Sequence, residues 1–122
     1  DMTDRRYPKS VRMLKQADFD RAFHAKVFAA DDTLVVNAAA NGLEVTRLGL
    51  SVSRKVGNAV VRNAWKRRIR EAFRLQRLEL PVGLDVVFRP KAGAVCDAAA
   101  IHKSLPELVR RVARKLRVGK AP

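Results

Sequence analysis

The chain has 122 residues, 48% of them hydrophobic, so residues 1–122 have the length of one ordinary domain with a modest core. Its formal net charge of +14 favours a polyanionic partner such as nucleic acid, with an anionic membrane surface as the other option. The sequence contains no apolar run of about 18 residues and no signal peptide, which predicts a soluble, cytoplasmic protein. A single cysteine, Cys96, excludes an intramolecular disulfide and a multi-cysteine zinc site.

The N-terminal part of the chain begins with residues 1–12, which are rich in Arg and Lys and poor in apolar side chains. We expect this segment to be a mobile basic arm. A helix is expected to begin around Asp18, whose carboxylate can cap it. Phe19 and Phe23 lie one helical turn apart, and the residues alone favour core packing for this pair.

Two strands are predicted next, at residues 33–38 and 45–53, with a turn at Asn41-Gly42 between them. The second strand alternates cleanly between large apolar residues and small or polar ones. The small and polar set is Gly49, Ser51 and Ser53. We expect that face of the sheet to be open to a ligand.

The most strongly patterned element is a basic helix predicted from about Asn58 onward. Residues three or four apart share a helical face, so the sequence divides into two stripes. The apolar stripe is Val61, Trp65, Ile69, Ala72 and Phe73. The opposite stripe is Arg62, Lys66, Arg70 and Arg74, with Asn63 and Arg67 beside it. Only one acid, Glu71, occurs in this helix, and it falls outside the cationic stripe, so we interpret that face as a surface for a phosphate backbone.

The C-terminal part is predicted to contain a break at Pro81–Gly83, a short strand at residues 84–88 and a final amphipathic helix. Two starts for that helix remain open because of Pro106. It can begin at Ser104, with Glu107 completing a capping box, or near Asp97 with a bend at the proline. Helices and strands in this order predict a layered α/β (α+β) fold rather than a helical bundle.

No catalytic apparatus is apparent in the sequence. His24 and His102 are far apart and lack the spacing of metal ligands. The adjacent pair Asp31-Asp32 is better suited to a turn. Binding residues are therefore a stronger signal than catalytic ones, and we assign no catalytic residue and no metal to the protein.

One long segment makes a family resemblance specific. Residues 49–73, GLSVSRKVGNAVVRNAWKRRIREAF, combine a basic pair after a strand, a Gly-Asn turn and a helix with spaced arginines. This segment resembles the signature of the bacterial ribonuclease P protein subunit, and the resemblance extends from about Arg12 to Val118. Ala64 departs from the pattern, because the family usually has a second arginine at that position. The matching positions are Arg54, Lys55, Gly57, Asn58, Arg62, Asn63, Lys66, Arg67 and Arg70.

The resemblance implies a fold and a role. The fold is a compact two-layer α/β sandwich in the order α-β-β-β-α-β-α, with a left-handed crossover through the basic helix. The role is to bind the catalytic ribonuclease P RNA and the 5′ leader of precursor tRNA, while Mg²⁺ held mainly by the RNA supports hydrolysis. The implied RNA contacts are Arg54, Lys55, Asn58, Arg62, Asn63, Lys66, Arg67, Arg70 and Arg74. The implied leader cleft contains Phe19, Phe23, Asn37, Ser51 and Ser53, with Asn37 at a position that is often aromatic in the family.

Charge and fold class alone fit a second hypothesis equally well. A noncatalytic RNA-binding module, such as a ribosome-associated protein, would show the same basic helix. The motif around Gly57 and Arg62 favours the ribonuclease P subunit.

Overall fold

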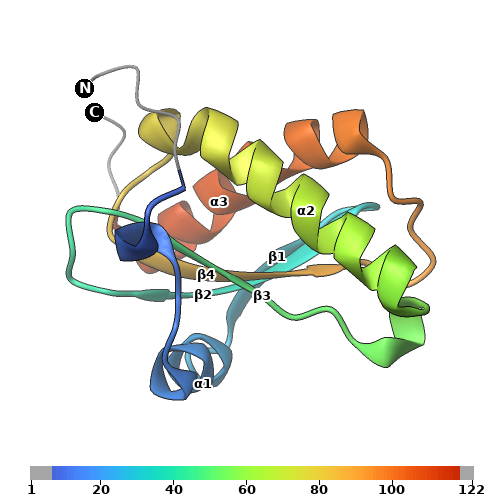
Figure 1. The fold of residues 1–122 in the computed structure, drawn as a ribbon. Helices are drawn as coiled ribbons and strands as arrows, with labels where there is room; N and C mark the ends of the chain where they lie inside the picture. Colours follow the sequence, from blue (N-terminus) through green and yellow to red (C-terminus); the bar gives the residue numbers. More distant parts are fainter. Residues whose placement is uncertain (1–6, 119–122) are drawn as a thin grey trace.

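A computed structural model describes residues 7–118 of the chain (Figure 1). Its principal elements occur in the predicted order α-β-β-β-α-β-α. Short 3-10 turns occur at Lys9–Val11, Arg54–Val56 and Arg77–Glu79. The helices are α1 (Gln16–His24), α2 (Ala59–Gln76) and α3 (Ala98–Leu116), and the strands are β1 (Val27–Ala30), β2 (Leu34–Ala40), β3 (Arg47–Leu50) and β4 (Leu84–Pro90).

The four strands form one sheet in the spatial order β1-β2-β4-β3. β2 pairs antiparallel with β1 and with β4, whereas β3 and β4 run parallel. A parallel pair needs a crossover connection, and α2 supplies it. The left-handed sense of that crossover stays a prediction.

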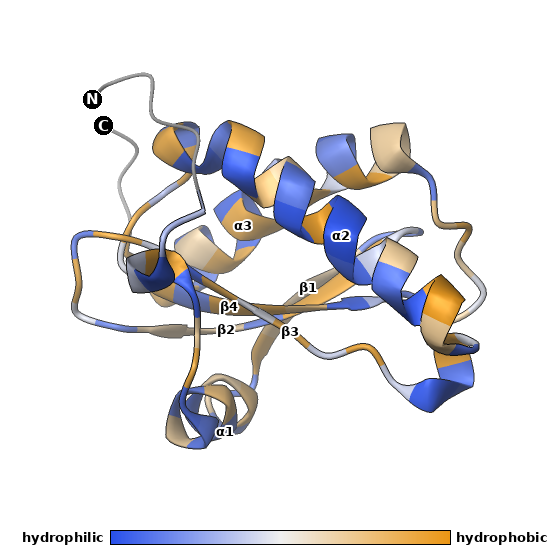
Figure 2. Ribbon diagram, in the orientation of Figure 1, coloured by the Kyte–Doolittle hydropathy of each residue, from blue (hydrophilic) through white to orange (hydrophobic). Residues whose placement is uncertain are grey.

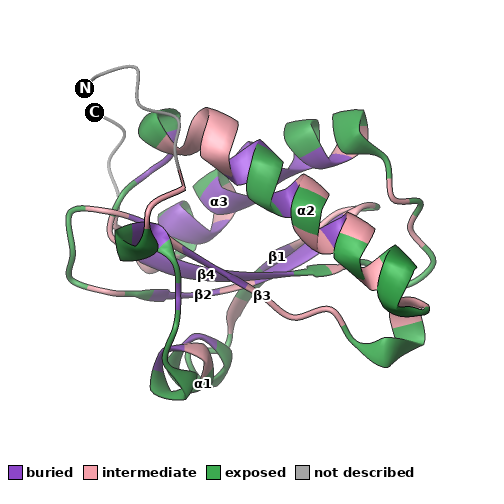
Figure 3. Cartoon of the chain, in the orientation of Figure 1, coloured by how far each residue is buried: buried purple, intermediate pink, exposed green. Residues whose placement is uncertain are grey.

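The helices divide between the two faces of the sheet (Figure 1). α2 and α3 cover one face and pack against each other, and the principal core lies beneath them. α1 lies against the opposite face, over β2 and β4. The expected two-layer sandwich is therefore incomplete as a description, because α1 adds a short third layer. Figure 3 shows the buried side of α2 and α3 turned toward the sheet.

β3 confirms the alternation that the sequence predicted, although it is shorter than residues 45–53. Leu48 is 1% exposed in the principal core. Gly49 faces the α1 layer, where a Cβ atom would lie 2.7 Å from Cε1 of Phe19. Glycine at this position therefore allows the Phe19 ring to lie directly on the strand.

α1 differs from its prediction at its start. It begins at Gln16, with Lys15 rather than Asp18 at the N-cap. Asp18 lies within the first turn, is buried, and forms ion pairs with Arg21 and Arg47. Its carboxylate is used for a tertiary contact, which local capping rules cannot anticipate.

α3 resolves the choice between two helix starts. Asp97 is the N-cap, and its carboxylate accepts a hydrogen bond of 2.9 Å from the backbone N–H of Ala100. Pro106 therefore lies inside the helix. Ser104 is not a cap; its hydroxyl donates to Asp31 Oδ2 at 2.5 Å.

The predicted basic arm is wrong for residues 7–12, while residues 1–6 lie outside the described part of the chain. Val11 is 2% exposed, and Tyr7 makes an edge-on ring contact with Phe73 at a centroid distance of 5.8 Å. Arg12 pairs with Leu48 of β3 through an isolated bridge. The segment is held because its few apolar side chains cover the end of the core.

Candidate nucleic-acid interface

The turn before α2 sets the direction of the basic helix. Asn58 caps α2, its side chain accepting a hydrogen bond of 3.0 Å from the Val61 N–H. Gly57 has a φ of 155°, and a Cβ there would lie 3.0 Å from the Val61 side chain. Gly57 thus has a backbone conformation that residues with a side chain rarely adopt, and Arg62 Nε donates to the Gly57 carbonyl oxygen. The family resemblance assigns Asn58 to RNA binding, and in the structure its side chain caps α2.

The inward side of α2 agrees with its apolar stripe except at the first position. Trp65, Ile69, Ala72 and Phe73 are at most 3% exposed. Val61 is 39% exposed, so its predicted burial is wrong. The N-terminal turn of α2 extends beyond the sheet in Figure 1, and Val61 is not among the residues that pack into the principal core.

The outward side of α2 carries the predicted cations, and Figure 2 shows it as a largely hydrophilic face. Arg62 and Lys66 are partly exposed, and Arg70 is exposed, as are Asn63 and Arg67 beside them. Glu71 lies outside the stripe, as predicted from its position in the helix, but its carboxylate forms an ion pair with Arg74 at the end of the stripe. The hydrogen bonds from Arg74 hold the pKa of Glu71 below its usual value. Within residues 7–118, the unneutralised part of the stripe is therefore Arg62, Lys66 and Arg70.

A cleft of about 520 Å³ joins this cationic stripe to α1. Its lining combines Phe19 and Met13, from the α1 side of the sheet, with Lys66 and Arg70 of α2. Gly49 and Leu50 of β3 also line it, as do Tyr7, Arg12, Leu14 and Leu48. The cleft thus offers an aromatic ring and two cations to the same ligand.

The two phenylalanines of α1 have different environments. Phe19 is partly buried against a small cluster of Met13, Ala22 and Val87, and it also lines the cleft. Phe23 is 37% exposed and is not among the residues that line the cleft. Phe19 therefore combines packing with an accessible ring edge, and the preference for core packing does not hold for Phe23.

Asn37 lies in a row of residues that crosses the α1 face of the sheet. It pairs with Phe28 of β1 and with Val87 of β4, and Val87 in turn pairs with Gly49. Arg89 Nη1 donates to Asn37 Oδ1 at 3.0 Å. Sequence reasoning missed Phe28, which is 55% exposed, and Arg89, because their proximity to Asn37 follows from strand register.

The remaining predicted site residues are spread around the N-terminal end of α2. Arg54 and Lys55 are exposed in the 3-10 turn, and Ser51 is partly exposed. Ser53 lines a different hollow, together with Lys55 and Trp65. The structure therefore separates Ser53 from the Phe19 cleft.

A buried charge cluster lies beneath α1, and no local pattern in the sequence predicts it. Asp85 of β4 is 0% exposed and accepts hydrogen bonds of 2.7 Å from both Arg47 and Arg21. Asn41 donates to the same carboxylate at 2.9 Å. Burial alone would raise the pKa of Asp85, but the hydrogen bonds and the arginine charges outweigh it and hold the pKa below its usual value. The cluster attaches α1 to the sheet through Arg21.

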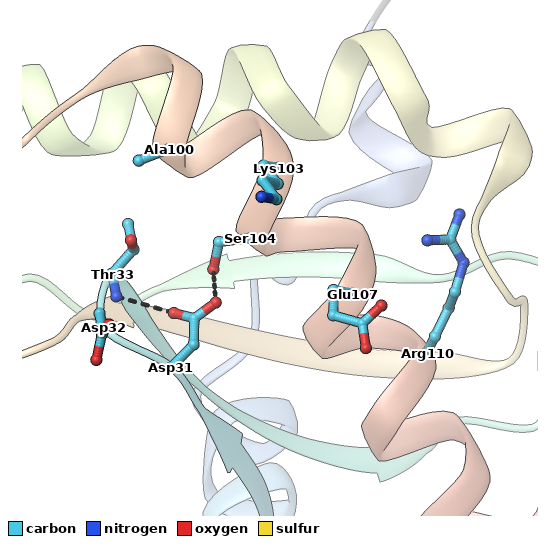
Figure 4. A pocket seen from close by; sticks show the side chains of 8 residues that line it. All are labelled: Asp31, Asp32, Thr33, Ala100, Lys103, Ser104, Glu107 and Arg110. Atoms are coloured by element: carbon cyan, nitrogen blue, oxygen red, sulfur yellow. Dashed lines mark hydrogen bonds between the residues drawn. The ribbon is translucent and has the colours of Figure 1, made fainter.

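A further hollow between the β1–β2 turn and α3 mixes acidic and basic side chains (Figure 4). Asp31 closes the turn by accepting from the N–H groups of Thr33 and Leu34, which confirms its predicted role. Its other oxygen accepts from Ser104, as Figure 4 shows. Lys103 and Arg110 stand beside Asp32 and Glu107 in the lining, so this hollow has no single charge preference.

The described residues show neither a metal cluster nor a membrane-spanning helix. No three His, Cys, Asp or Glu side chains between residues 7 and 118 gather into a possible metal site. No helix in that range is both long and apolar enough to cross a membrane.

Comparison with known proteins identifies the family. The ribonuclease P family profile matches residues 7–113. A ribonuclease P protein component of Desulfovibrio desulfuricans is 42% identical over 123 residues, covering 92% of each chain. One from Brevibacillus brevis is 39% identical and covers 84% of this chain and 83% of the relative.

Solved structures agree with the sequence relatives. The ribonuclease P protein of Staphylococcus aureus superposes with a TM-score of 0.72 at 32% identity, covering 92% of this chain and all of that one. The Thermotoga maritima protein, solved with 1-(4-fluorophenyl)-2-thiourea, gives a TM-score of 0.75 at 32% identity, covering 82% and 98%. The shared fold, the cationic face of α2 and these matches together show that the chain belongs to the ribonuclease P protein family.

Proposed function

We propose that this chain is the protein subunit of ribonuclease P, which binds the catalytic RNA and the 5′ leader of precursor tRNA. In this role it assists RNA-catalysed, Mg²⁺-dependent removal of the leader. The observation that carries the proposal is the single cleft that is lined by Phe19 of α1 and by Lys66 and Arg70 of α2. An aromatic ring beside cations suits a single strand, whose bases stack while its phosphates are neutralised.

The two binding surfaces have separate tasks in this proposal. The exposed cations of α2, with Arg54 and Lys55 before it, neutralise phosphates of the RNA subunit. The cleft takes the unpaired leader, with Gly49 allowing the Phe19 ring to lie against β3. Asn37 and Arg89, joined by their hydrogen bond, add polar groups on the same face of the sheet.

The hydrolytic step belongs to the RNA in this proposal, with Mg²⁺ as its cofactor. Several acids of the protein are engaged in structural contacts, which supports this division of labour. Asp85 is held by arginines, Asp31 closes a turn, and Asp97 caps α3. The protein residues therefore bind and orient RNA rather than transfer protons at the scissile phosphate.

Reconstitution tests this proposal. A bacterial ribonuclease P RNA at low Mg²⁺ concentration should cleave precursor tRNA at the leader junction only when the protein is added. Purified protein freed of nucleic acid should leave the same substrate intact. Site-specific cleavage by protein alone would contradict the assignment of chemistry to RNA. Binding to RNA without any gain in cleavage would instead favour the alternative, a noncatalytic RNA-binding protein.

A further inference from the structure

A second hollow, of about 520 Å³, lies at the N-terminal end of α2, distinct in its lining from the Phe19 cleft. We propose that it binds an unpaired nucleotide of the RNA subunit, with the base on its apolar floor and the phosphate on its lysines. This inference rests on the proposed function. The hollow is lined by Ser53, Lys55, Val56, Val61, Trp65, Pro90, Lys91, Ala92, Gly93, Ala94 and Cys96.

Most of the residues that line this hollow are apolar, and some of them are exposed to solvent. Val61 lines it and is 39% exposed, although it belongs to the apolar stripe of α2. Val95, between the lining residues Ala94 and Cys96 in the sequence, is 78% exposed but does not itself line the hollow. The start of α2 and the β4–α3 loop both contain hydrophobic segments in Figure 2, and both are coloured exposed or intermediate in Figure 3. Exposed apolar side chains that gather around a hollow indicate a binding surface.

The walls are held in place by contacts that do not involve a ligand. Arg68 of α2 donates to the carbonyl oxygen of Cys96, and its Nη1 also lies 3.3 Å from the Cys96 sulfur. This contact fixes the β4–α3 loop against the helix. On the other wall, Gly57 and the Asn58 cap set the position of Val61. The site is therefore largely preformed, which lowers the entropic cost of binding.

The charged residues that line this hollow indicate which class of ligand it binds. Lys55 and Lys91 are the charged residues of the described lining, and both are exposed. No acid is found among those described lining residues. An apolar hollow with two cations in its lining is complementary to a nucleobase that carries its own phosphate. An apolar side chain of a protein partner would leave the lysines unpaired unless an acid accompanied it.

The position of the hollow points to the RNA subunit rather than to the leader. Val61 is adjacent in the helix to Arg62, the first cation of the stripe that we assign to the RNA subunit. The Phe19 cleft, assigned to the leader, is lined by other residues, toward α1 and the middle of α2. A base that leaves an RNA bound at Arg62 would therefore lie nearer to the Val61 hollow than to the Phe19 cleft.

Two valines provide a matched test. Val61→Ala removes apolar surface from the hollow, whereas Val60→Ala changes a neighbouring valine that is 77% exposed and does not line it. We expect Val61→Ala to weaken binding of a bacterial ribonuclease P RNA about tenfold, from the loss of two buried methyl groups, and Val60→Ala to change it little.

The salt dependence of RNA binding should stay unchanged for Val61→Ala, whereas Lys55→Ala should lower the log–log slope of affinity against salt by about 0.7. Melting temperatures of both valine variants should match the unmodified chain.

Cys96 provides an independent readout, because the chain has one cysteine and that residue lines the hollow. The ribonuclease P RNA should slow labelling of the thiol by a reagent such as iodoacetamide several-fold. Precursor tRNA alone should not. Equal affinities for the two valine variants, or an unprotected thiol in a complex that still assists cleavage, would overturn the nucleotide site while leaving the proposed function intact. Failure of the unmodified chain to bind the RNA would instead refute the proposed function.

Discussion

Gln76 of α2 donates a hydrogen bond of 3.0 Å to the backbone carbonyl oxygen of His102 in α3. That carbonyl lies four residues before Pro106, which has no N–H to complete the helical hydrogen bond. The side chain of one helix thus satisfies an acceptor that the proline leaves unpaired in the other. This contact explains how α3 continues through Pro106 in a helix of 19 residues.

Gln76→Ala should therefore lower the free energy of unfolding by about 1 kcal/mol, because the His102 carbonyl loses its donor. In a Pro106→Ala background the same change should cost less, since an alanine at that position can supply the missing N–H. Denaturant unfolding of both single variants and the double variant measures this coupling. Identical effects of Gln76→Ala in the two backgrounds would show that the hydrogen bond does not compensate for the proline.

Asp85→Asn should destabilise the protein by roughly 3 kcal/mol at neutral pH, because Arg47 and Arg21 lose a buried counter-charge. The lowered pKa of Asp85 means that its contribution is present above the unfolded-state pKa of about 4 and is lost as pH falls through the folded-state value. The variant should consequently lose less stability than the unmodified chain on acidification below about pH 4. Unfolding curves at several pH values test this, and parallel curves for the two proteins would contradict it.

Changing Arg62 and Lys66 together to Ala should weaken RNA binding and lower its salt dependence. Each lost phosphate contact reduces the log–log salt slope by roughly 0.7–0.9. Lys103→Ala removes an exposed cation of α3 and serves as the control, with little expected change. An unchanged slope for the α2 variant would mean that this face is only solvated.

Phe19→Ala should weaken binding of precursor tRNA more than that of mature tRNA, by about 1–3 kcal/mol if one leader base loses its stacking partner. Because Phe19 also packs on Met13 and Ala22, we expect a moderate fall in melting temperature as well. Both affinities and the melting temperature should be measured on one preparation. Equal losses for the two tRNAs would assign Phe19 to packing alone.

Arg111 and Lys115 of α3 donate to the carbonyl oxygens of Ala30 and Phe28. These acceptors belong to β1, an edge strand of the sheet, and covering them blocks pairing with another chain. Changing both cations to Ala should promote self-association, measured by light scattering against protein concentration. Arg110→Ala with Arg114→Ala removes the same charge from the same helix and should leave self-association unchanged. Equal association of both double variants would indicate an effect of net charge alone.

The sequence determined the features that are local and periodic. It predicted α2 from the alternation of cations and apolar residues, the Asn58 start of that helix, the two-sided character of β3, and the turns at Asp31 and Asn41. It also predicted the family, because the segment from Gly49 to Phe73 combines several residue types at fixed spacing. These features follow from repeat and capping preferences that act within a few residues.

The tertiary structure decided which distant residues meet. Asp85 joins Arg47 and Arg21, Arg89 joins Asn37, and Phe19 and Lys66 line the same cleft. In the structure Val61 is exposed although it belongs to the apolar stripe of α2. Residues 7–12 pack against the core although their basic composition predicted a mobile arm. Such outcomes depend on strand register and on where each helix crosses the sheet. Those are set by the packing of the whole core and by long-range pairing, so no short stretch of sequence contains them.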